Sequence, residues 1–232
     1  MTRGLFLCGT DTDVGKTAVA ESILRELVRG GVAVGVCKPV ASGVTADGGD
    51  PYRLWLAAGQ PGTLADVCPQ SFAAPLAPAR AAAAEGRCID EALLVSAVEA
   101  WRGRSGCVVV EGAGGLYSPL SPRMLNADLA RTLGFPLVVC DDARLGAIGR
   151  TLAVVTAARS QGHQVAAVVL SEVSDPGSAD ADDSQSPAAI ALSAVEDLAE
   201  RLAPLPVAFL RHGAERIEPA LDWMGLAGCG LM

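Results

Sequence analysis

The feature that most constrains the fold is a glycine-rich loop near the N-terminus. Residues 9–17 read GTDTDVGKT, directly after the apolar run 5–8 and before the amphipathic segment 18–28. A strand, a glycine loop and a helix in this order present backbone N–H groups at a helix N-terminus, where a phosphate anion binds. The loop therefore predicts a βα unit with a site for nucleotide phosphates.

The spacing within this loop is one residue longer than usual. The common pattern G-x-x-x-x-G-K-[ST] has four residues between its glycines, whereas five separate Gly9 from Gly15. The side chains that such a loop needs are present, because Lys16 can reach a transferred γ-phosphate and the Thr17 hydroxyl can bind Mg²⁺. We expect these residues to contact the nucleotide: Asp13, Val14, Gly15, Lys16, Thr17 and Ala18.

Short apolar runs alternate with helical patterns along the rest of the chain. Strands are predicted at residues 5–8, 33–37, 107–110, 137–140, 165–170 and 207–210, and helices at 18–28, 90–101, 126–133, 148–158 and 188–202. This alternation predicts one α/β domain of the P-loop class over residues 1–232, with a mostly parallel sheet between two layers of helices. The polar residues 174–187 predict a loop.

Composition and charge exclude several functional classes. The net charge is −8 and no basic stripe is present, so we expect no nucleic-acid partner. No apolar run reaches the roughly 18 residues that span a bilayer. Seven scattered cysteines without a C-x-x-C pair favour a reducing, cytoplasmic environment. We assign no role to His163 or His212.

Charged residues follow two of the predicted strands. Lys38 is costly at the end of a buried strand unless it faces a polar site, so we expect it to contact a phosphate or a substrate anion; a lysine that extends into solvent is the alternative. Glu111 resembles the acid of a Walker B strand, which binds Mg²⁺ or its waters; the alternative is a glutamate that caps a glycine turn. Asp50 is a further metal-ligand candidate, or an ordinary helix N-cap before Pro51.

The segments GTDTDVGKT, KPVASG and VEGAGG, in this order, resemble the dethiobiotin synthetase family. Residues 71–78 and 144–148 add to this resemblance, which covers roughly residues 3–173. It implies a biotin-biosynthetic ligase that closes a ureido ring on 7,8-diaminononanoate with CO₂ and ATP, through a carbamate and a carbamic–phosphoric anhydride. It also implies Mg²⁺ as cofactor and a homodimer whose substrate lies near the subunit interface.

The resemblance assigns roles to individual residues. Lys16 and Lys38 would be the catalytic cations that hold the phosphoryl and carbamate oxygens. Mg²⁺ would lie among Thr17, Asp50 and Glu111. The diamine would contact Thr12, Lys38 and Ser42, and the phosphate path would follow Glu111, Gly112, Ala113 and Gly114.

Two positions depart from the family. An Asn-Asp pair, whose Asn contacts the adenine edge, is replaced here by Ser171 and Glu172. One hydroxyl cannot make the bidentate contact of an amide, so we expect relaxed base selectivity, with other nucleoside triphosphates accepted beside ATP. An Asn-His pair near the diamine carboxylate is replaced by Gly149 and Arg150. Arg150 either binds that carboxylate through two parallel hydrogen bonds from its guanidinium or is a solvent-facing arginine.

Two other classes share parts of this pattern. A ligase of the cobyrinate a,c-diamide synthase type carries a glutaminase domain, which we do not expect within 232 residues. A partition-type ATPase has a second lysine near the start of its phosphate loop, where this chain has Thr-Asp-Thr-Asp at residues 10–13. Phosphate release that requires both the diamine and bicarbonate would separate the synthetase from such a switch protein.

Overall fold

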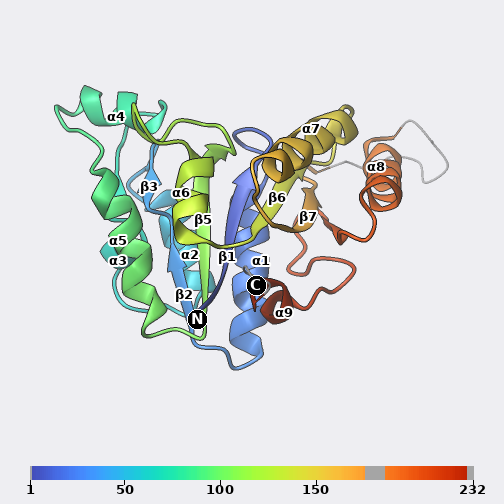
Figure 1. Ribbon diagram of the computed structural model, residues 1–232, viewed down its shortest axis with the longest axis horizontal. Coiled ribbons are helices and arrows are strands. Elements are labelled where there is room, and N and C mark those ends of the chain that lie inside the picture. Colours follow the sequence, from blue (N-terminus) through green and yellow to red (C-terminus); the bar gives the residue numbers. More distant parts are fainter. Residues whose placement is uncertain (1, 176–185, 229–232) are drawn as a thin grey trace.

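The structure of the protein, a computed structural model, describes residues 2–175 and 186–228. Residues 176–185 of the predicted loop lie outside the described residues. Within the described part, six strands form one parallel sheet in the order β2-β5-β1-β6-β7-β8 (Figure 1). The predicted mostly parallel α/β sheet is therefore confirmed. The strands are β1 (Arg3–Gly9), β2 (Val34–Cys37), β5 (Cys107–Gly115), β6 (Leu137–Asp142), β7 (Val165–Ser171) and β8 (Val207–Leu210).

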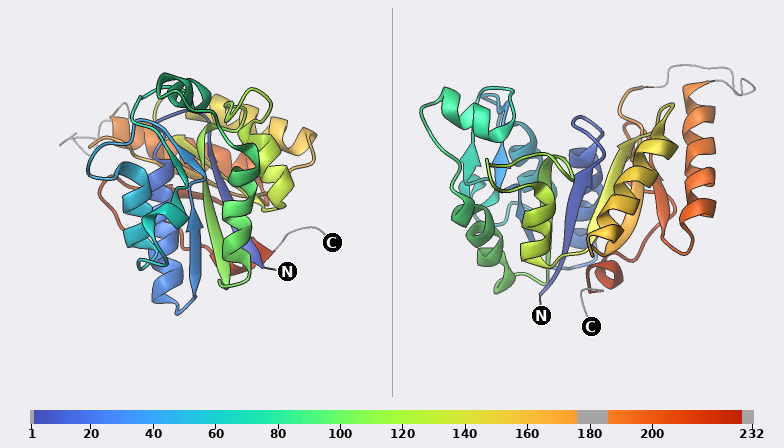
Figure 2. Two further views of the ribbon diagram at one scale, coloured as in Figure 1. Left: turned by 90° about the vertical axis from the view of Figure 1, so that its left-hand side faces the viewer. Right: turned by 45° about the horizontal axis from the view of Figure 1, so that its top comes forward.

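Helices cover both faces of this sheet (Figure 2). One face carries α1 (Lys16–Arg29) and α2 (Gly49–Ala57), which contact each other, together with α9 (Trp223–Gly228), which packs on β1. The other face carries α5 (Glu91–Arg102), α6 (Asn126–Leu133) and α7 (Ala147–Ser160). α8 (Pro187–Leu202) packs on β8 and against α7.

The core forms because the central strands carry apolar side chains toward both helical layers. Leu5, Leu7, Val109 and Val138 are all fully buried. Continuous aliphatic runs of this kind suit a parallel sheet with two covered faces. The helix ends follow local signals, as at α5, where the side chain of Asp90 accepts the N–H of Leu93 at 3.0 Å.

The stretch between β2 and β5 contains elements that the sequence patterns did not predict. A two-stranded parallel sheet pairs β3 (Val40–Ala41) with β4 (Gln70–Ser71). Two short helices flank β4, with α3 (Leu64–Val67) before it and α4 (Pro78–Ala84) after it. Elements this short contain too few residues to show a hydrophobic period. The N-cap alternative for Asp50 is wrong, because α2 begins at Gly49 after Gly48 and Asp50 lies in its first turn.

The parallel arrangement brings the carboxyl ends of all these strands to one edge of the sheet, the upper edge in Figure 1. The loops that follow the strands therefore meet there, as ligand-binding loops do in open α/β sheets. Among the described residues, no helix combines the length and apolarity that crossing a membrane requires.

Candidate functional site

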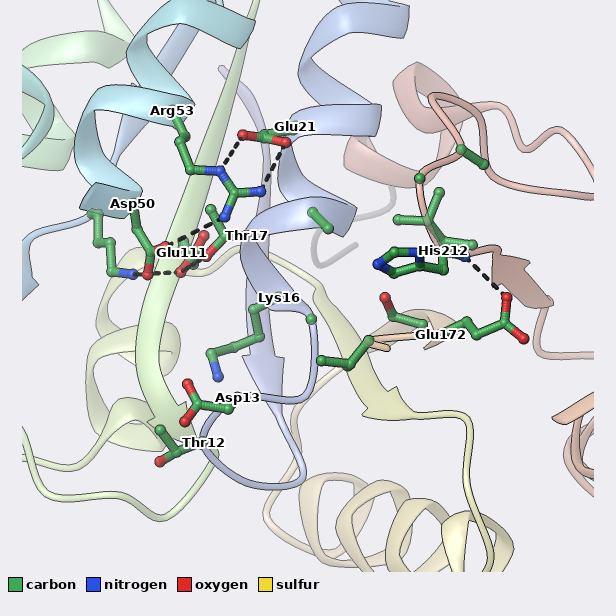
Figure 3. A pocket seen from close by; sticks show the side chains of 18 of the residues that line it. Thr12, Asp13, Lys16, Thr17, Glu21, Asp50, Arg53, Glu111, Glu172 and His212 are labelled. Carbon is green, nitrogen blue, oxygen red and sulfur yellow. Dashed lines mark hydrogen bonds and ion pairs between the residues drawn. The ribbon is translucent and has the colours of Figure 1, made fainter. Parts of the chain in front are cut away.

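A cavity of about 660 Å³ opens at this edge of the sheet (Figure 3). Its walls come from the phosphate loop, the first turns of α1 and α2, and the ends of β2, β5, β7 and β8. A second cavity of about 570 Å³ adjoins it and shares Thr12, Asp13 and Ser42. The predicted site residues that line the larger cavity are Thr12, Asp13, Gly15, Lys16, Thr17, Ala18, Lys38, Ser42, Asp50, Glu111, Ala113, Gly114, Ser171 and Glu172.

The phosphate loop presents a helix N-terminus to the cavity. Gly15 is the N-cap of α1 with a φ of 85°, and no side chain caps the first N–H groups of the helix. The Lys16 ammonium folds back over the loop and donates to the carbonyl of Asp11 at 3.1 Å. A Cβ atom at Gly9 would lie 3.1 Å from this ammonium, so glycine leaves it room. Free N–H donors and a lysine in this arrangement can hold a phosphate anion.

Three charged groups from separate elements meet beside this loop. The Nζ of Lys38, just after β2, lies 2.5 Å from Asp50 Oδ2 and 2.7 Å from Glu111 Oε1. The Thr17 hydroxyl donates to the same Glu111 oxygen at 3.1 Å. Because β5 lies between β2 and β1, Glu111 is placed between Lys38 and the phosphate loop.

The charges of this cluster stabilise one another. Burial lowers the pKa of Lys38, but the carboxylates of Glu111 and Asp50 outweigh it and raise the pKa to about 12. Burial also raises the pKa of Asp50, yet the neighbouring Lys38 ammonium holds it below its usual value. The ammonium and the Asp50 carboxylate are therefore both charged at neutral pH.

Glu111 offers the clearest sign of a missing ligand. Its second oxygen, Oε2, is buried and has no hydrogen-bond partner among the described residues. A buried carboxylate oxygen without a donor is costly, and a hard cation would satisfy it. Thr17, Asp50 and Glu111 offer hydroxyl and carboxylate oxygens, which are the donors that Mg²⁺ prefers. The described residues hold no group of three or more histidine, cysteine or carboxylate side chains that could bind a metal. Phosphate and water would therefore have to complete the shell.

The opposite end of the cavity is built from the ends of β7 and β8. Ser171 is buried and packs on the phosphate loop, since a Cβ atom at Gly15 would lie 2.4 Å from its hydroxyl oxygen. Glu172 accepts the backbone N–H of His212 at 3.0 Å through Oε2. Its Oε1 is buried and has no hydrogen-bond partner within the described ranges. Figure 3 places Glu172 and His212 across the cavity from Asp50 and Glu111.

Three predicted site residues are not brought to the cavity wall. Val14 points into the core, and a Cβ atom at Gly112 would meet the side chain of Asn126 at 2.7 Å. The Arg150 guanidinium donates to Asp141 Oδ1 at 3.2 Å and to a backbone carbonyl at 3.1 Å. The Arg150 guanidinium is therefore neither available beside this cavity to bind a substrate carboxylate nor simply directed at solvent.

The structure adds cavity residues that the sequence analysis missed. Glu21 and Arg25 follow Thr17 at intervals of four on α1, a spacing that places all three on one helix face and could have revealed them. Arg53 joins them from α2. His212, to which the sequence analysis gave no role, lines the cavity in the loop after β8, where no local pattern indicates it.

Comparisons with known proteins agree first on the class. A family model described as an AAA domain matches residues 3–208. The signal recognition particle receptor FtsY from Elizabethkingia anophelis, solved in complex with GDP, superposes with a TM-score of 0.55 at 13% identity. The match covers 98% of this chain but 63% of the receptor chain, so this chain spans less than two thirds of it and the likeness concerns the fold alone. The sheet order and the phosphate loop define a P-loop nucleoside triphosphatase fold.

Sequence relatives narrow this class to one family. The ATP-dependent dethiobiotin synthetase BioD of Anaeromyxobacter dehalogenans (strain 2CP-C) is 48% identical over 170 residues, which are 72% of this chain and 76% of that protein. The protein of the same name from Caulobacter sp. (strain K31) is 39% identical over 176 residues, 74% of this chain and 76% of the relative. The chain belongs to the dethiobiotin synthetase family, as its three motifs indicated.

Proposed function

We propose that this chain is an ATP-dependent dethiobiotin synthetase of biotin biosynthesis. It joins 7,8-diaminononanoate and CO₂ into the ureido ring of dethiobiotin and converts ATP to ADP and phosphate. The observation that carries the proposal is the convergence of Lys16, Lys38, Asp50 and Glu111 on one cavity at the carboxyl edge of the sheet. Membership of the family supplies the substrates.

The reaction requires two C–N bonds and one phosphoryl transfer. One amine of the diamine adds to CO₂ and loses a proton, which gives a carbamate. A carbamate oxygen attacks the γ-phosphorus of ATP, the bond to the β–γ bridging oxygen breaks, and ADP leaves. The second amine attacks the carbonyl carbon of the mixed anhydride, loses a proton and expels phosphate. No side chain becomes covalently modified, so catalysis depends on positioning and charge.

Lys16 and Lys38 supply the positive charge for the transferred group. Lys16 and the N–H groups at the start of α1 hold the terminal phosphates of ATP. Two of the three N–H donors of Lys38 go to Asp50 and Glu111, which leaves one for a carbamate or phosphoryl oxygen. Because its pKa is raised to about 12, Lys38 acts as a fixed cation and not as a proton donor.

Mg²⁺ would be held by Thr17, Asp50 and Glu111, with water and phosphate oxygens as its remaining ligands. When bound, it would neutralise and orient the terminal phosphates. The support for this assignment is the oxygen Oε2 of Glu111, buried without a hydrogen-bond partner in the described part of the chain.

The diamine is assigned to the adjoining cavity of about 570 Å³, beside Thr12 and Ser42. The nucleotide base is assigned to the opposite end, beside Ser171, Glu172 and residues 210–215. No amide side chain is available at position 171 to contact a base edge, so CTP and GTP are expected to serve beside ATP. Arg150 is left out of the substrate site because Asp141 already binds its guanidinium.

A homodimer remains part of the proposal because the family resemblance implies one. Analytical ultracentrifugation of the purified chain measures this state directly. A monomer that is fully active would remove the dimer from the proposal and leave the assigned chemistry in place.

An assay with two omissions tests the proposed reaction. The purified chain is incubated with ATP, Mg²⁺, bicarbonate and the diamine, and both phosphate and dethiobiotin are quantified. We expect equal amounts of the two products, and loss of both when either the diamine or bicarbonate is left out. ATP hydrolysis that continues at the same rate without the diamine would refute the synthetase and favour a switch ATPase.

A further inference from the structure

An ion pair that the proposed chemistry does not use joins α1 to α2 beside the metal-ligand candidates. Arg53 Nε lies 2.8 Å from Glu21 Oε1, and Arg53 Nη2 lies 3.2 Å from Glu21 Oε2. Two parallel hydrogen bonds of this kind fix orientation as well as distance. The third nitrogen, Nη1, lies 3.9 Å from Asp50 Oδ1, and Figure 3 shows Arg53 between Glu21 and Asp50.

Glu21 and Arg53 lie about one helical turn beyond the metal-ligand candidates on their respective helices. Glu21 lies four residues after Thr17 on α1, and Arg53 lies three residues after Asp50 on α2. Residues at these intervals share a helix face. The two helices therefore meet at two successive levels. The first contains the metal-ligand candidates Thr17 and Asp50, and the second contains the fork between Glu21 and Arg53.

The first turn of α2 needs such an external contact. The helix has 9 residues, and its N-cap, Gly48, has a φ of 88° and offers no side-chain hydrogen bond. A helix of this length has little stability of its own. By contrast, α1 has 14 residues and continues directly from the phosphate loop. The two hydrogen bonds from Arg53 to Glu21 on α1 therefore fix the position of the start of α2 relative to the phosphate loop.

Glu21 is an unusual residue for its position. Its side chain is 10% exposed, and a carboxylate this buried is costly unless it is paired. Arg53 binds both of its oxygens, whereas Arg25, on the same helix, approaches only one, at 3.5 Å. The Arg53 side chain is 50% exposed, so the pair is only partly buried and contributes little net stability, but its two parallel hydrogen bonds do restrict geometry.

We infer that Glu21 and Arg53 are positioning residues, whose fork orients the first turn of α2 so that Asp50 faces the proposed Mg²⁺ site. Neither residue contacts the reacting atoms in this assignment. The inference rests on the proposed function, because it assigns the fork a purpose in binding the metal of that reaction.

Single and double substitutions of Glu21 and Arg53 test whether their ion pair supports Mg²⁺ binding. In Arg53→Ala and Glu21→Ala, the Mg²⁺ concentration for half-maximal activity at saturating ATP should rise on the order of tenfold, the usual effect of losing a contact behind a metal ligand. The KM for the diamine should stay unchanged. The double variant should resemble each single one, because both residues act as one unit. Arg53→Lys, which keeps the charge but not the fork, should fall between wild type and Arg53→Ala.

A binding measurement gives a readout that is independent of turnover. Calorimetric titration of Mg²⁺ into the complex of the protein with ADP should show the same tenfold weakening in Arg53→Ala. Arg201→Ala is the matched control, because it removes an arginine that pairs with Asp197 at 4.0 Å on the distant helix α8. This control should bind Mg²⁺ as the wild type does.

The outcomes separate a positioning role from a structural one. Folded Arg53→Ala protein with an unchanged Mg²⁺ constant overturns the inference, whether or not its melting temperature has dropped. If Arg53→Ala does not fold, the Mg²⁺ constant of Arg53→Lys decides in the same way. If the wild type makes no dethiobiotin, the proposed function fails, and the calorimetric titrations still decide whether the fork supports a metal site.

Discussion

Replacing Lys38 with methionine tests the charge cluster at its centre. The substitution removes the cation between Asp50 and Glu111 and keeps a side chain of similar length. Removing one partner of a buried ion pair costs about 3–5 kcal/mol, because the other charge stays buried without compensation. Water can reach Asp50, whose side chain is 43% exposed, but not Glu111, whose side chain is 1% exposed. The penalty therefore falls mainly on Glu111.

The assay is urea denaturation at about pH 7.5, where the ion pair of the wild type is complete. The folded-state pKa of Lys38 is raised from 10.5 to about 12, so its stabilisation is fully present below 10.5 and disappears as the pH rises through 12. We expect Lys38→Met to lower the free energy of unfolding by about 3–5 kcal/mol. This loss corresponds to roughly 6–20 °C in melting temperature for a chain of this size.

A second variant shows whether the buried charge is the cause. In Lys38→Met with Glu111→Gln, a neutral amide replaces the carboxylate that was left without its cation. This double variant should recover on the order of 2 kcal/mol relative to Lys38→Met alone. A loss below about 1 kcal/mol in the single variant, or a double variant no more stable than the single one, would refute the reasoning from burial.

Three further measurements test other parts of the site. Glu111→Gln should raise the Mg²⁺ concentration for half-maximal activity by about tenfold or more, because an amide oxygen is a poorer ligand than a carboxylate; an unchanged constant would exclude Glu111 as a metal ligand. With Ser171 in place of an amide, kcat/KM for ATP, CTP and GTP should agree within about tenfold, and a strong preference for ATP over both others would contradict relaxed selectivity. Arg150→Ala should lower the free energy of unfolding by about 1–3 kcal/mol, because it leaves the fully buried Asp141 without its cation. If Arg150→Ala unfolds at the same urea midpoint as the wild type, the Arg150–Asp141 ion pair contributes nothing to stability.

The sequence predicted the sheet well because its strands carry an unambiguous signal. The run 107–110 is continuously apolar, and the strand that contains it was expected, although β5 continues to Gly115 through glycines that dilute the hydrophobic pattern. The helix predicted at 18–28 begins earlier, at Lys16, because the phosphate loop turns directly into α1. In both cases the boundary was missed where the backbone approaches the cavity.

The strand order and the contacts between helices could not be predicted from the chain alone. No local pattern indicates that β5 lies between β2 and β1, although this order is what places Glu111 beside Lys38. Glu21 and Arg53 are 32 positions apart and look like ordinary surface charges until α2 packs on α1. His212 likewise reaches the cavity through the loop after β8, far along the chain from the phosphate loop.

The central place of β1 has a consequence for how the protein is made. This strand is translated before the two strands with which it pairs, because β5 and β6 begin only at Cys107 and Leu137. Its apolar side chains therefore lack these partners until residues 107–142 have been translated, and unpaired strands of this kind are prone to aggregate. The cavity is also incomplete at that stage, because residues 210–215, which form part of its wall, follow later in the chain. Until β6 has been translated, β1 thus lacks a neighbouring strand, and the chain lacks the complete cavity through which a ligand could stabilise it.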